Sequence, residues 1–216
     1  MSARENILAR IRSAQGKPPV VTASEREQVR AHIATHAQSP RPRVAEDPIA
    51  CFRERALALS STLDAVATLA EVPKVVASYL ARNDLPLDAV CWPGLLEPGW
   101  AAAGLRVAAR AARDGDLVGI TGAFCAIAET GTLMMVSGPG TPAATSLLPE
   151  THIALVATNR IVRGMEEAWQ LLRAELSALP RAVTFISGPS RTADIEQTVT
   201  LGAHGPYRVH IVLLGQ

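Results

Sequence analysis

Short apolar runs alternate with amphipathic stretches along most of this chain of 216 residues. Apolar residues at helical spacing predict helices over residues 47–59, 71–83, 165–179 and 192–201, with a helical turn over 97–103. Apolar runs bounded by turn residues predict strands over residues 89–92, 105–109, 116–121, 152–158, 183–187 and 207–214, and two further apolar runs flank Thr130 and Gly131. Helices that alternate with short buried strands are typical of a mostly parallel sheet with crossover helices. Beyond Asp47 the pattern therefore predicts an α/β fold.

The beginning of the chain has a different pattern. Apolar residues at helical spacing predict an amphipathic helix over residues 2–15, which Gly16 and two prolines end. Ser24 is a candidate N-cap for a second helix that runs toward His36. The proline-rich run 39–43 then predicts a stiff, extended connector.

The charge of the chain changes this picture in one respect. The 21 Lys and Arg and 20 Asp and Glu side chains give a net charge of +1, so no overall field attracts nucleic acid or an anionic membrane. Residues 1–46, however, hold eight basic side chains against four acidic ones, a local excess of +4. We interpret residues 1–43 as a helical arm with its connector, either mobile or packed, with partner contact as the alternative. Residues 44–216 form the predicted α/β domain.

The cysteines and histidines limit which cofactors the chain can hold. Cys51, Cys91 and Cys125 lie 40 and 34 positions apart, so they predict no disulfide framework and cannot by themselves hold a four-thiolate iron–sulfur cluster. The histidines have no tight ligand spacing, so we expect no metal site and no cofactor. No apolar run is long enough to span a membrane or to serve as a signal peptide. We therefore expect a cytoplasmic protein without membrane insertion.

Glu129 is one of only two formally charged residues between Leu117 and Thr158; the other is Glu150. It precedes Gly131, which permits a tight turn and the close approach of another group. A partly desolvated carboxylate in such a turn can serve as a nucleophile or a general base. The alternative is that Glu129 caps local amides at a strand end.

The segment Ser187–Glu196 joins a predicted buried strand to a predicted helix start through small residues. Ligands of open α/β sheets bind at the carboxyl ends of the strands, where a helix N-terminus offers amides to an anion. Arg191 would add a bidentate donor for a carboxylate or phosphate, whereas the alternative is that Ser190 or Thr192 only caps the helix. The candidate ligand-binding residues, which include a glycine-flanked histidine further on, are Ser187, Gly188, Ser190, Arg191, Thr192, Asp194, His204 and Gly205.

A second loop, residues 137–142, is rich in glycine, proline and hydroxyl side chains. Such a composition is suited to offering backbone N–H groups to an anion. The loop lacks the spacing and the lysine of a phosphate-binding P-loop. An ordinary mobile loop is therefore the preferred interpretation of this segment taken alone.

Five ordered motifs of the chain are diagnostic together. They are Gly119-Ile-Thr-Gly-Ala123 with Ala126-Ile-Ala-Glu-Thr-Gly-Thr132, Ser146-Leu-Leu-Pro149 with His152-Ile153, Ser187–Glu196, and Gly202-Ala-His-Gly-Pro206. This succession resembles the lactate utilisation protein C family of LUD-domain proteins. The resemblance covers Leu117 to Leu214 closely.

The resemblance implies a three-layer α/β fold with helices on both faces of a mostly parallel sheet, similar to the sugar-phosphate isomerase and CoA-transferase group. It also implies a role in oxidising L-lactate to pyruvate with iron–sulfur partner proteins, in a subunit without its own redox cofactor. Two alternatives stay open. One is an acyl- or CoA-transfer enzyme with Glu129 as nucleophile, and the other is a small-anion binding module with Arg191 as the clamp.

Overall fold

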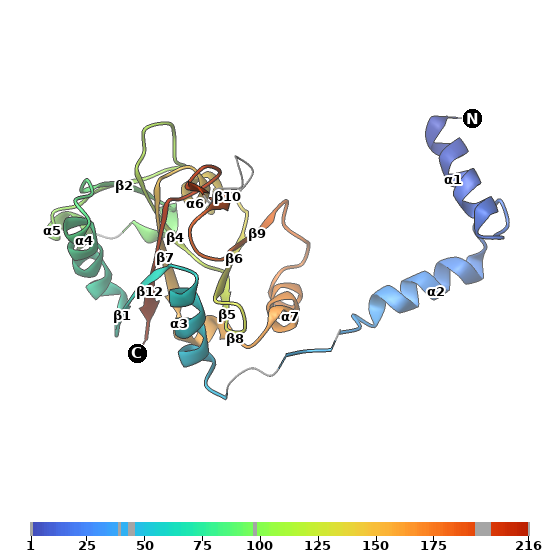
Figure 1. Cartoon of the computed structure of the whole chain (residues 1–216), viewed down its shortest axis with the longest axis horizontal. Helices are drawn as coiled ribbons and strands as arrows, with labels where there is room; N and C mark the ends of the chain where they lie inside the picture. The colour runs from blue at the N-terminus through green and yellow to red at the C-terminus, as the bar shows by residue number, and fades with distance from the viewer. Residues whose placement is uncertain (1, 39, 43–45, 97–98, 193–199, 216) are drawn as a thin grey trace. The chain divides into compact units, whose positions relative to one another are not determined.

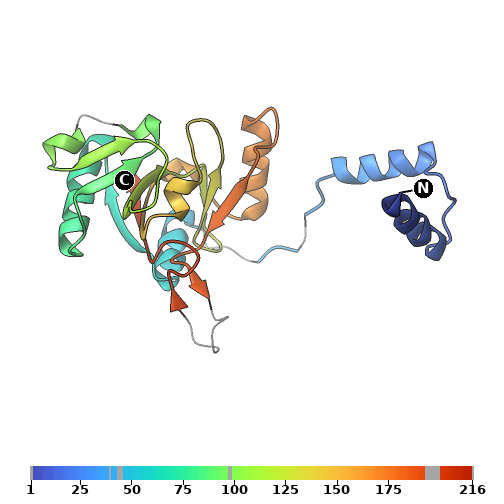
Figure 2. The same ribbon diagram turned by 90° about the horizontal axis from the view of Figure 1, so that it is seen from above.

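The computed structural model describes residues 2–38, 40–42, 46–96, 99–192 and 200–215 (Figures 1 and 2). Contacts within the chain divide it into two compact units, Met1–Arg41 and Pro42–Gln216. Each unit is described by itself below. Within the described residues, no helix combines the length and the apolar character needed to cross a membrane.

The first unit contains two helices, α1 (Ala3–Ala14) and α2 (Ala23–Ala34). Ser2 caps α1 in a capping box with Glu5. The N-cap of α2 is Thr22, whose side chain accepts a hydrogen bond from the backbone N–H of Glu25. The prediction that Ser24 is the cap is therefore wrong by two residues, because the equivalent hydroxyl of Thr22 takes that place.

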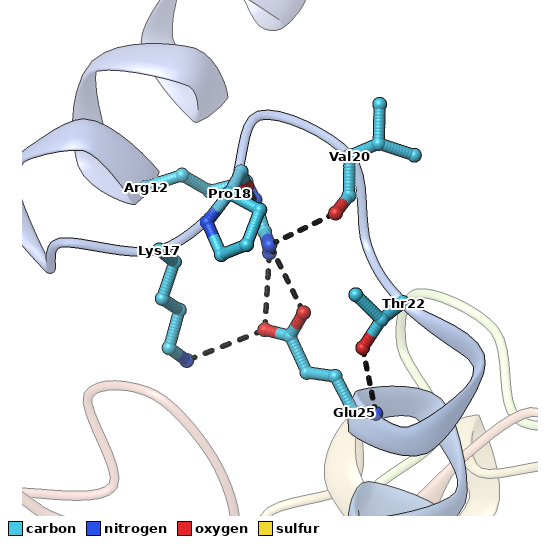
Figure 3. A network of polar contacts seen from close by, with 6 residues as sticks. All are labelled: Arg12, Lys17, Pro18, Val20, Thr22 and Glu25. Carbon is cyan, nitrogen blue, oxygen red and sulfur yellow. Dashed lines mark hydrogen bonds and ion pairs between the residues drawn. The ribbon is translucent and has the colours of Figure 1, made fainter.

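A polar network joins the ends of these two helices (Figure 3). The guanidinium of Arg12 donates to both carboxylate oxygens of Glu25 at 3.1 and 2.9 Å, and its Nε donates to the carbonyl of Pro18 at 2.7 Å. The hydrogen bond from Arg12 lowers the pKa of Glu25 to about 2. Neither helix has a buried residue, and Ile7 and Ile33 are mostly exposed. Polar contacts rather than an apolar core therefore set the corner between α1 and α2.

The second unit is built on a six-stranded sheet in which every neighbouring pair is parallel. Central strands are buried on both faces, as the continuous apolar sequences of such strands require. In spatial order the strands are β1 (Thr62–Val66), β12 (Arg208–Leu214), β7 (Thr151–Ala157), β4 (Val118–Gly122), β2 (Asp88–Cys91) and β3 (Arg106–Ala109).

A second, four-stranded sheet follows a different pattern. Its strands in spatial order are β8 (Ile161–Val162), β5 (Cys125–Ile127), β6 (Thr132–Val136) and β9 (Val183–Ile186). β5 and β6 form an antiparallel hairpin, and β9 runs antiparallel to β6. The register pairs Leu133 with Ile186 and Val136 with Val183. One end of this sheet therefore carries the hairpin turn and Ser187, which we call the turn end, and the opposite end carries Ser137 and Ala182.

Helices cover these sheets in layers (Figure 1). α4 and α5 pack on one face of the six-stranded sheet, and α3 and the four-stranded sheet pack on the other. α7 covers the outer face of the four-stranded sheet. The helices and 3₁₀ turns are α3 (Pro48–Ala58), η1 (Leu69–Glu71), α4 (Val72–Arg82), η2 (Pro93–Leu95), α5 (Gly99–Ala102), α6 (Ala144–Leu147), η3 (Thr158–Arg160) and α7 (Met165–Glu175). The predicted α/β fold with a mostly parallel sheet is confirmed.

The helix predicted over residues 192–201 is wrong at both of its ends. Arg191–Thr192 forms strand β10 and Thr200–Leu201 forms strand β11, and these strands pair antiparallel. Residues 193–199 lie outside the described part of the chain. The β-branched residues Thr192 and Thr200 face each other in this pair, and such side chains favour strands over helices.

Candidate functional site

Most of the predicted site residues lie in three segments, residues 129–132, 187–191 and 202–206, which we call the three-loop site. The first loop is the β5–β6 hairpin turn and the second follows β9, so both lie at the turn end of the four-stranded sheet. The third loop precedes β12. The contacts described next join the three loops to one another and to α3.

Glu129 is half-buried in the hairpin turn. Its backbone N–H donates to the carbonyl of Arg163 at 3.0 Å, while its Oε2 atom is buried without a hydrogen-bond partner among the described residues. Gly131 has a φ of +64°, and a Cβ there would lie 2.5 Å from the backbone nitrogen of Ala56 in α3. The turn is therefore pressed against α3 at Gly131.

A chain of hydroxyl groups connects the first two loops. Thr130 Oγ1 donates to Thr132 Oγ1 at 2.8 Å, and Thr132 Oγ1 lies 2.7 Å from Ser187 Oγ. Thr132 is buried, whereas Ser187 is exposed. The hydroxyl chain thus joins the exposed Thr130 to the exposed Ser187 through the buried Thr132.

Gly188 and Arg191 both contact the end of α3. Gly188 has a φ of +78°, and a Cβ there would lie 2.3 Å from the carbonyl oxygen of Leu59. A guanidinium nitrogen of Arg191 donates to that same carbonyl at 3.1 Å and to Ser60 Oγ at 2.6 Å. An arginine that bonds the last carbonyls of a helix stabilises its C-terminus. In this structure Arg191 holds the end of α3.

The third loop is attached through Ser190. The backbone N–H of Ser190 donates to the carbonyl of Pro206 at 2.9 Å, and the N–H of Gly202 donates to the carbonyl of Ser190 at 2.9 Å. A Cβ on Gly205 would lie 3.4 Å from the Cβ of Ser190. The side chain of His204 is exposed. Among the other predicted residues, Thr192 lies in β10 and Asp194 lies outside the described residues, as does Glu196.

The expected strand-to-helix junction is corrected by these observations. Thr192 is a strand residue, so the helix start that was to supply amides at this position is absent. β9, which leads into Ser187, belongs to the four-stranded sheet and not to the parallel one. The carboxyl ends of the parallel strands therefore lie elsewhere in the molecule.

Those carboxyl ends carry a cavity of about 560 Å³ that the sequence did not reveal. Trp92 follows β2 directly, and Phe124 lies just beyond the end of the neighbouring strand β4. The loop 137–141 after β6 and residues from 176 to 180 after α7 complete the walls. The predicted strand 89–92 included Trp92, whereas β2 ends at Cys91, and the loop 137–142 that the sequence analysis singled out lines this cavity.

Two buried histidines lie within the parallel sheet. Nε2 of His152 bonds Thr121 Oγ1 at 2.7 Å, and Nδ1 of His210 bonds Thr62 Oγ1 at 2.9 Å. The ring of His210 stacks on Tyr79 with 3.8 Å between centroids. Burial lowers the pKa of each histidine to about 4, so both are neutral at pH 7. Among the described residues, no group of three or more His, Cys, Asp or Glu could hold a metal ion.

The three cysteines lie in different surroundings. Cys91 is buried under α4 and α5, Cys125 is buried under α7 beside the sulfur of Met134 at 3.6 Å, and Cys51 Sγ donates to the carbonyl of Ala128 at 3.4 Å. Burial raises the pKa of Cys91 and of Cys125 to about 11. Because thiolates and not thiols bind metals, these two cysteines are poor ligands at neutral pH.

Comparison with known proteins agrees with the motifs. Lactate utilization protein C of Exiguobacterium sp. is 43% identical to this chain over 100 residues, which are 45% of this chain and 44% of that protein. Lactate utilization protein C of Bacillus subtilis is 36% identical over 100 residues, which are 45% of this chain and 42% of that protein. The chain thus spans less than half the length of these curated relatives.

A solved structure is also similar. The crystal structure of a DUF162 family protein from Deinococcus radiodurans has a TM-score of 0.59 and 27% identity, and the match covers 81% of this chain and 100% of that chain. A family model described as the LUD domain matches residues 65–214. This match spans more than half of the 216 residues and includes the three-loop site and the six parallel strands except for the beginning of β1. The chain belongs to the LUD-domain family.

Proposed function

We propose that this chain takes part in L-lactate utilisation, as a cytoplasmic subunit without its own redox cofactor that works with iron–sulfur partner proteins. The observation that carries this proposal is the similarity to proteins named Lactate utilization protein C, at 36% and 43% identity over 100 residues. The alignments cover under half of each relative, so the role of the whole relative comes to this chain as part of the proposal.

The chemistry of the thiols supports a division of labour. Oxidation of L-lactate to pyruvate releases two electrons and two protons, which must pass to an acceptor. Cys91 and Cys125 lie under different helices and have pKa values raised to about 11 by burial. Protonated, separated thiols do not suit a thiolate-bound cluster. In this proposal the electrons therefore pass through the partner proteins.

The three-loop site is the part of the chain that we assign to this role. Its hydroxyl chain from Thr130 to Ser187 offers donors near the surface, and the buried Oε2 of Glu129 lies in the same turn. Hydroxyl groups of this kind can bind the carboxylate of a small organic acid. The proposed ligand is a small carboxylate such as lactate or pyruvate, or a phosphate.

Deletion of the gene in its host tests the proposal. We expect the deletion strain to fail to grow on L-lactate as sole carbon source, to grow on glucose, and to recover on lactate when the gene is restored. The purified chain alone is expected to transfer no electrons from L-lactate to a dye acceptor. Unimpaired growth of the deletion strain on lactate, or dye reduction by the isolated chain, would overturn the proposal.

Glu129 favours one alternative function. A carboxylate oxygen that is buried without a hydrogen-bond donor is more reactive than a solvated one, so Glu129 could attack the carbonyl of an acyl-CoA. The new bond would be a mixed anhydride on Glu129, with CoA thiol as the leaving group. Incubation with acetyl-CoA would then add one acetyl group to the mass of the chain, and Glu129→Gln would abolish this increment. Absence of any adduct on the parent chain would reject the alternative.

A further inference from the structure

The cavity at the carboxyl ends of β2 and β4 has aromatic walls. Trp92 lies against Gly122, with its ring carbons 3.7 and 3.9 Å from where a Cβ of that glycine would be. Phe124 lines the cavity and carries the guanidinium of Arg160 at 4.7 Å from its ring centroid. Arg160 is itself paired with Glu175. The cavity therefore has two aromatic lining residues whose side chains are held by their surroundings.

The polar side chains of the wall each have a hydrogen-bond partner within the protein. Trp92 Nε1 donates to the carbonyl of Pro142 at 3.2 Å, and Thr141 Oγ1 donates to the carbonyl of Val136 at 2.7 Å. Ser137 Oγ accepts from the backbone N–H of Ala182 at 2.8 Å. A ligand in this cavity therefore meets mainly apolar surfaces and aromatic rings, because the Trp92 and Thr141 donors bond backbone carbonyls and Ser137 Oγ already accepts from a backbone N–H.

Charge is the second property of the wall. None of the described residues that line the cavity is an Asp, Glu, Lys, Arg or His. An anion that entered would lose its hydration without gaining a cationic partner, which is unfavourable. The cavity thus suits neither lactate nor phosphate.

The volume of the cavity and the turn beside it also bear on what it can bind. A volume of about 560 Å³ lies in the range of about 300–1,000 Å³ that is usual for small-molecule sites. The loop that closes one side is a tight turn, in which the N–H of Thr141 donates to the carbonyl of Gly138 at 3.1 Å. The sequence interpretation of residues 137–142 as an ordinary mobile loop stays a prediction.

We propose that this cavity binds an uncharged, planar ring compound in contact with Trp92 and Phe124. Aromatic side chains bind flat rings through their faces and edges, and a wall of satisfied polar groups leaves little to reward a charged substituent. The site is separate from the three-loop site, and the proposal does not depend on the role in lactate utilisation.

Two probes that differ by one charge test the proposal. Menadione is an uncharged two-ring compound, and 1,4-naphthoquinone-2-sulfonate has the same ring system with an anionic group. We expect equilibrium dialysis against the full chain to show saturable binding of menadione at one site, and binding of the sulfonate at least tenfold weaker. Absence of saturable menadione binding, or equal binding of the two probes, would overturn the proposal.

Matched variants test whether menadione binds in this cavity. Gly140 lines the cavity and Gly94 does not, and in both a Cβ would meet no atom within 4 Å, so a large side chain can be added without a clash at its first carbon. Gly140→Phe and Ala178→Phe are expected to weaken menadione binding at least tenfold by occupying the cavity, whereas Gly94→Phe binds like the parent. Thermal unfolding midpoints close to that of the parent show that the variants are folded. Parent-like binding by both cavity variants would overturn the proposed location.

Discussion

The two ends of the four-stranded sheet differ in almost every physical property. At the turn end, Gly131 and Gly188 are pressed against the backbone of α3, and Glu129 has a buried oxygen without a partner. At the cavity end, Gly140 has open space where a side chain would be, and the polar side chains of Ser137 and Thr141 are satisfied. One end is tightly packed and polar, and the other is hollow and apolar.

This difference gives the two proposed sites different physical environments on one small sheet. Close backbone packing at Gly131 and Gly188 holds the turn that contains Glu129 and the hydroxyl chain, and a preorganised polar site of this kind would suit the proposed polar ligand. A hollow with satisfied polar groups instead selects against charge. The predictions below test how independent the two ends are.

Acid should destabilise both ends of the four-stranded sheet together, because that sheet packs on the six-stranded sheet. The pKa of His152 and of His210 is lowered by burial to about 4, below the ordinary value near 6.5. The folded state therefore binds fewer protons than the unfolded state, and stability is full above pH 6.5 and falls as the pH drops toward 4. Urea unfolding should show a loss of about 2 kcal/mol per histidine between pH 8 and pH 5.

His210→Gln provides the control for this pH dependence. The amide is uncharged at every pH in this range, so the variant should lose about half of the pH-dependent destabilisation. A stability that is constant between pH 8 and pH 5 in the parent chain would contradict the burial of these histidines.

Alanine substitutions of one glycine at each end should have very different effects on the free energy of unfolding. Gly188→Ala places a Cβ 2.3 Å from the carbonyl oxygen of Leu59 and strains a φ of +78°, so the free energy of unfolding should fall by about 3 kcal/mol. In Gly140→Ala the new Cβ meets no atom within 4 Å, so the free energy of unfolding should change by less than about 0.5 kcal/mol. Equal effects of the two substitutions in urea unfolding would remove the contrast between the ends.

The hydroxyl chain should show a smaller effect. Thr132→Val and Ser187→Ala each break the 2.7 Å contact between their oxygens, so the two effects should not add. A double-mutant cycle in urea unfolding should give a coupling energy of about 1 kcal/mol. Strict additivity would show that the contact contributes nothing to the turn end.

A substitution in the first unit should have the smallest effect on the stability of the sheets. Arg12→Ala removes the donor that bonds Glu25, so amide hydrogen exchange should become faster in residues 15–25. The unfolding midpoint of residues 42–216 should not change, because the contacts of Arg12 lie within the first unit. A shift of that midpoint would mean that the two units stabilise each other.

The sequence was most informative where burial and periodicity agree. β7 and β12 are continuous apolar runs and were predicted within one residue at each end. β1 was missed because this edge strand exposes Thr62 and half-exposes Asp64, so its sequence lacks the apolar character of a central strand. Apolar spacing alone also could not distinguish a helix from the strand pair β10–β11.

The sites were less predictable than the fold, for a physical reason. The position of Glu129 in a tight turn follows from Gly131, but the packing of that turn depends on α3, which lies about 75 residues away in the sequence. The cavity has walls from four separate segments, and each segment alone has an ordinary composition. Contacts between distant segments therefore decided both sites, and no local pattern encodes such contacts.

The central claim is that the turn end serves lactate utilisation, and complementation of the deletion strain tests it most directly. Glu129→Gln keeps the shape of the side chain but removes its charge, and Glu150→Gln makes the same change at an exposed position. We predict that the Glu150→Gln gene restores growth on L-lactate and the Glu129→Gln gene does not, with equal amounts of both proteins in the cell. Full growth with Glu129→Gln would contradict the account.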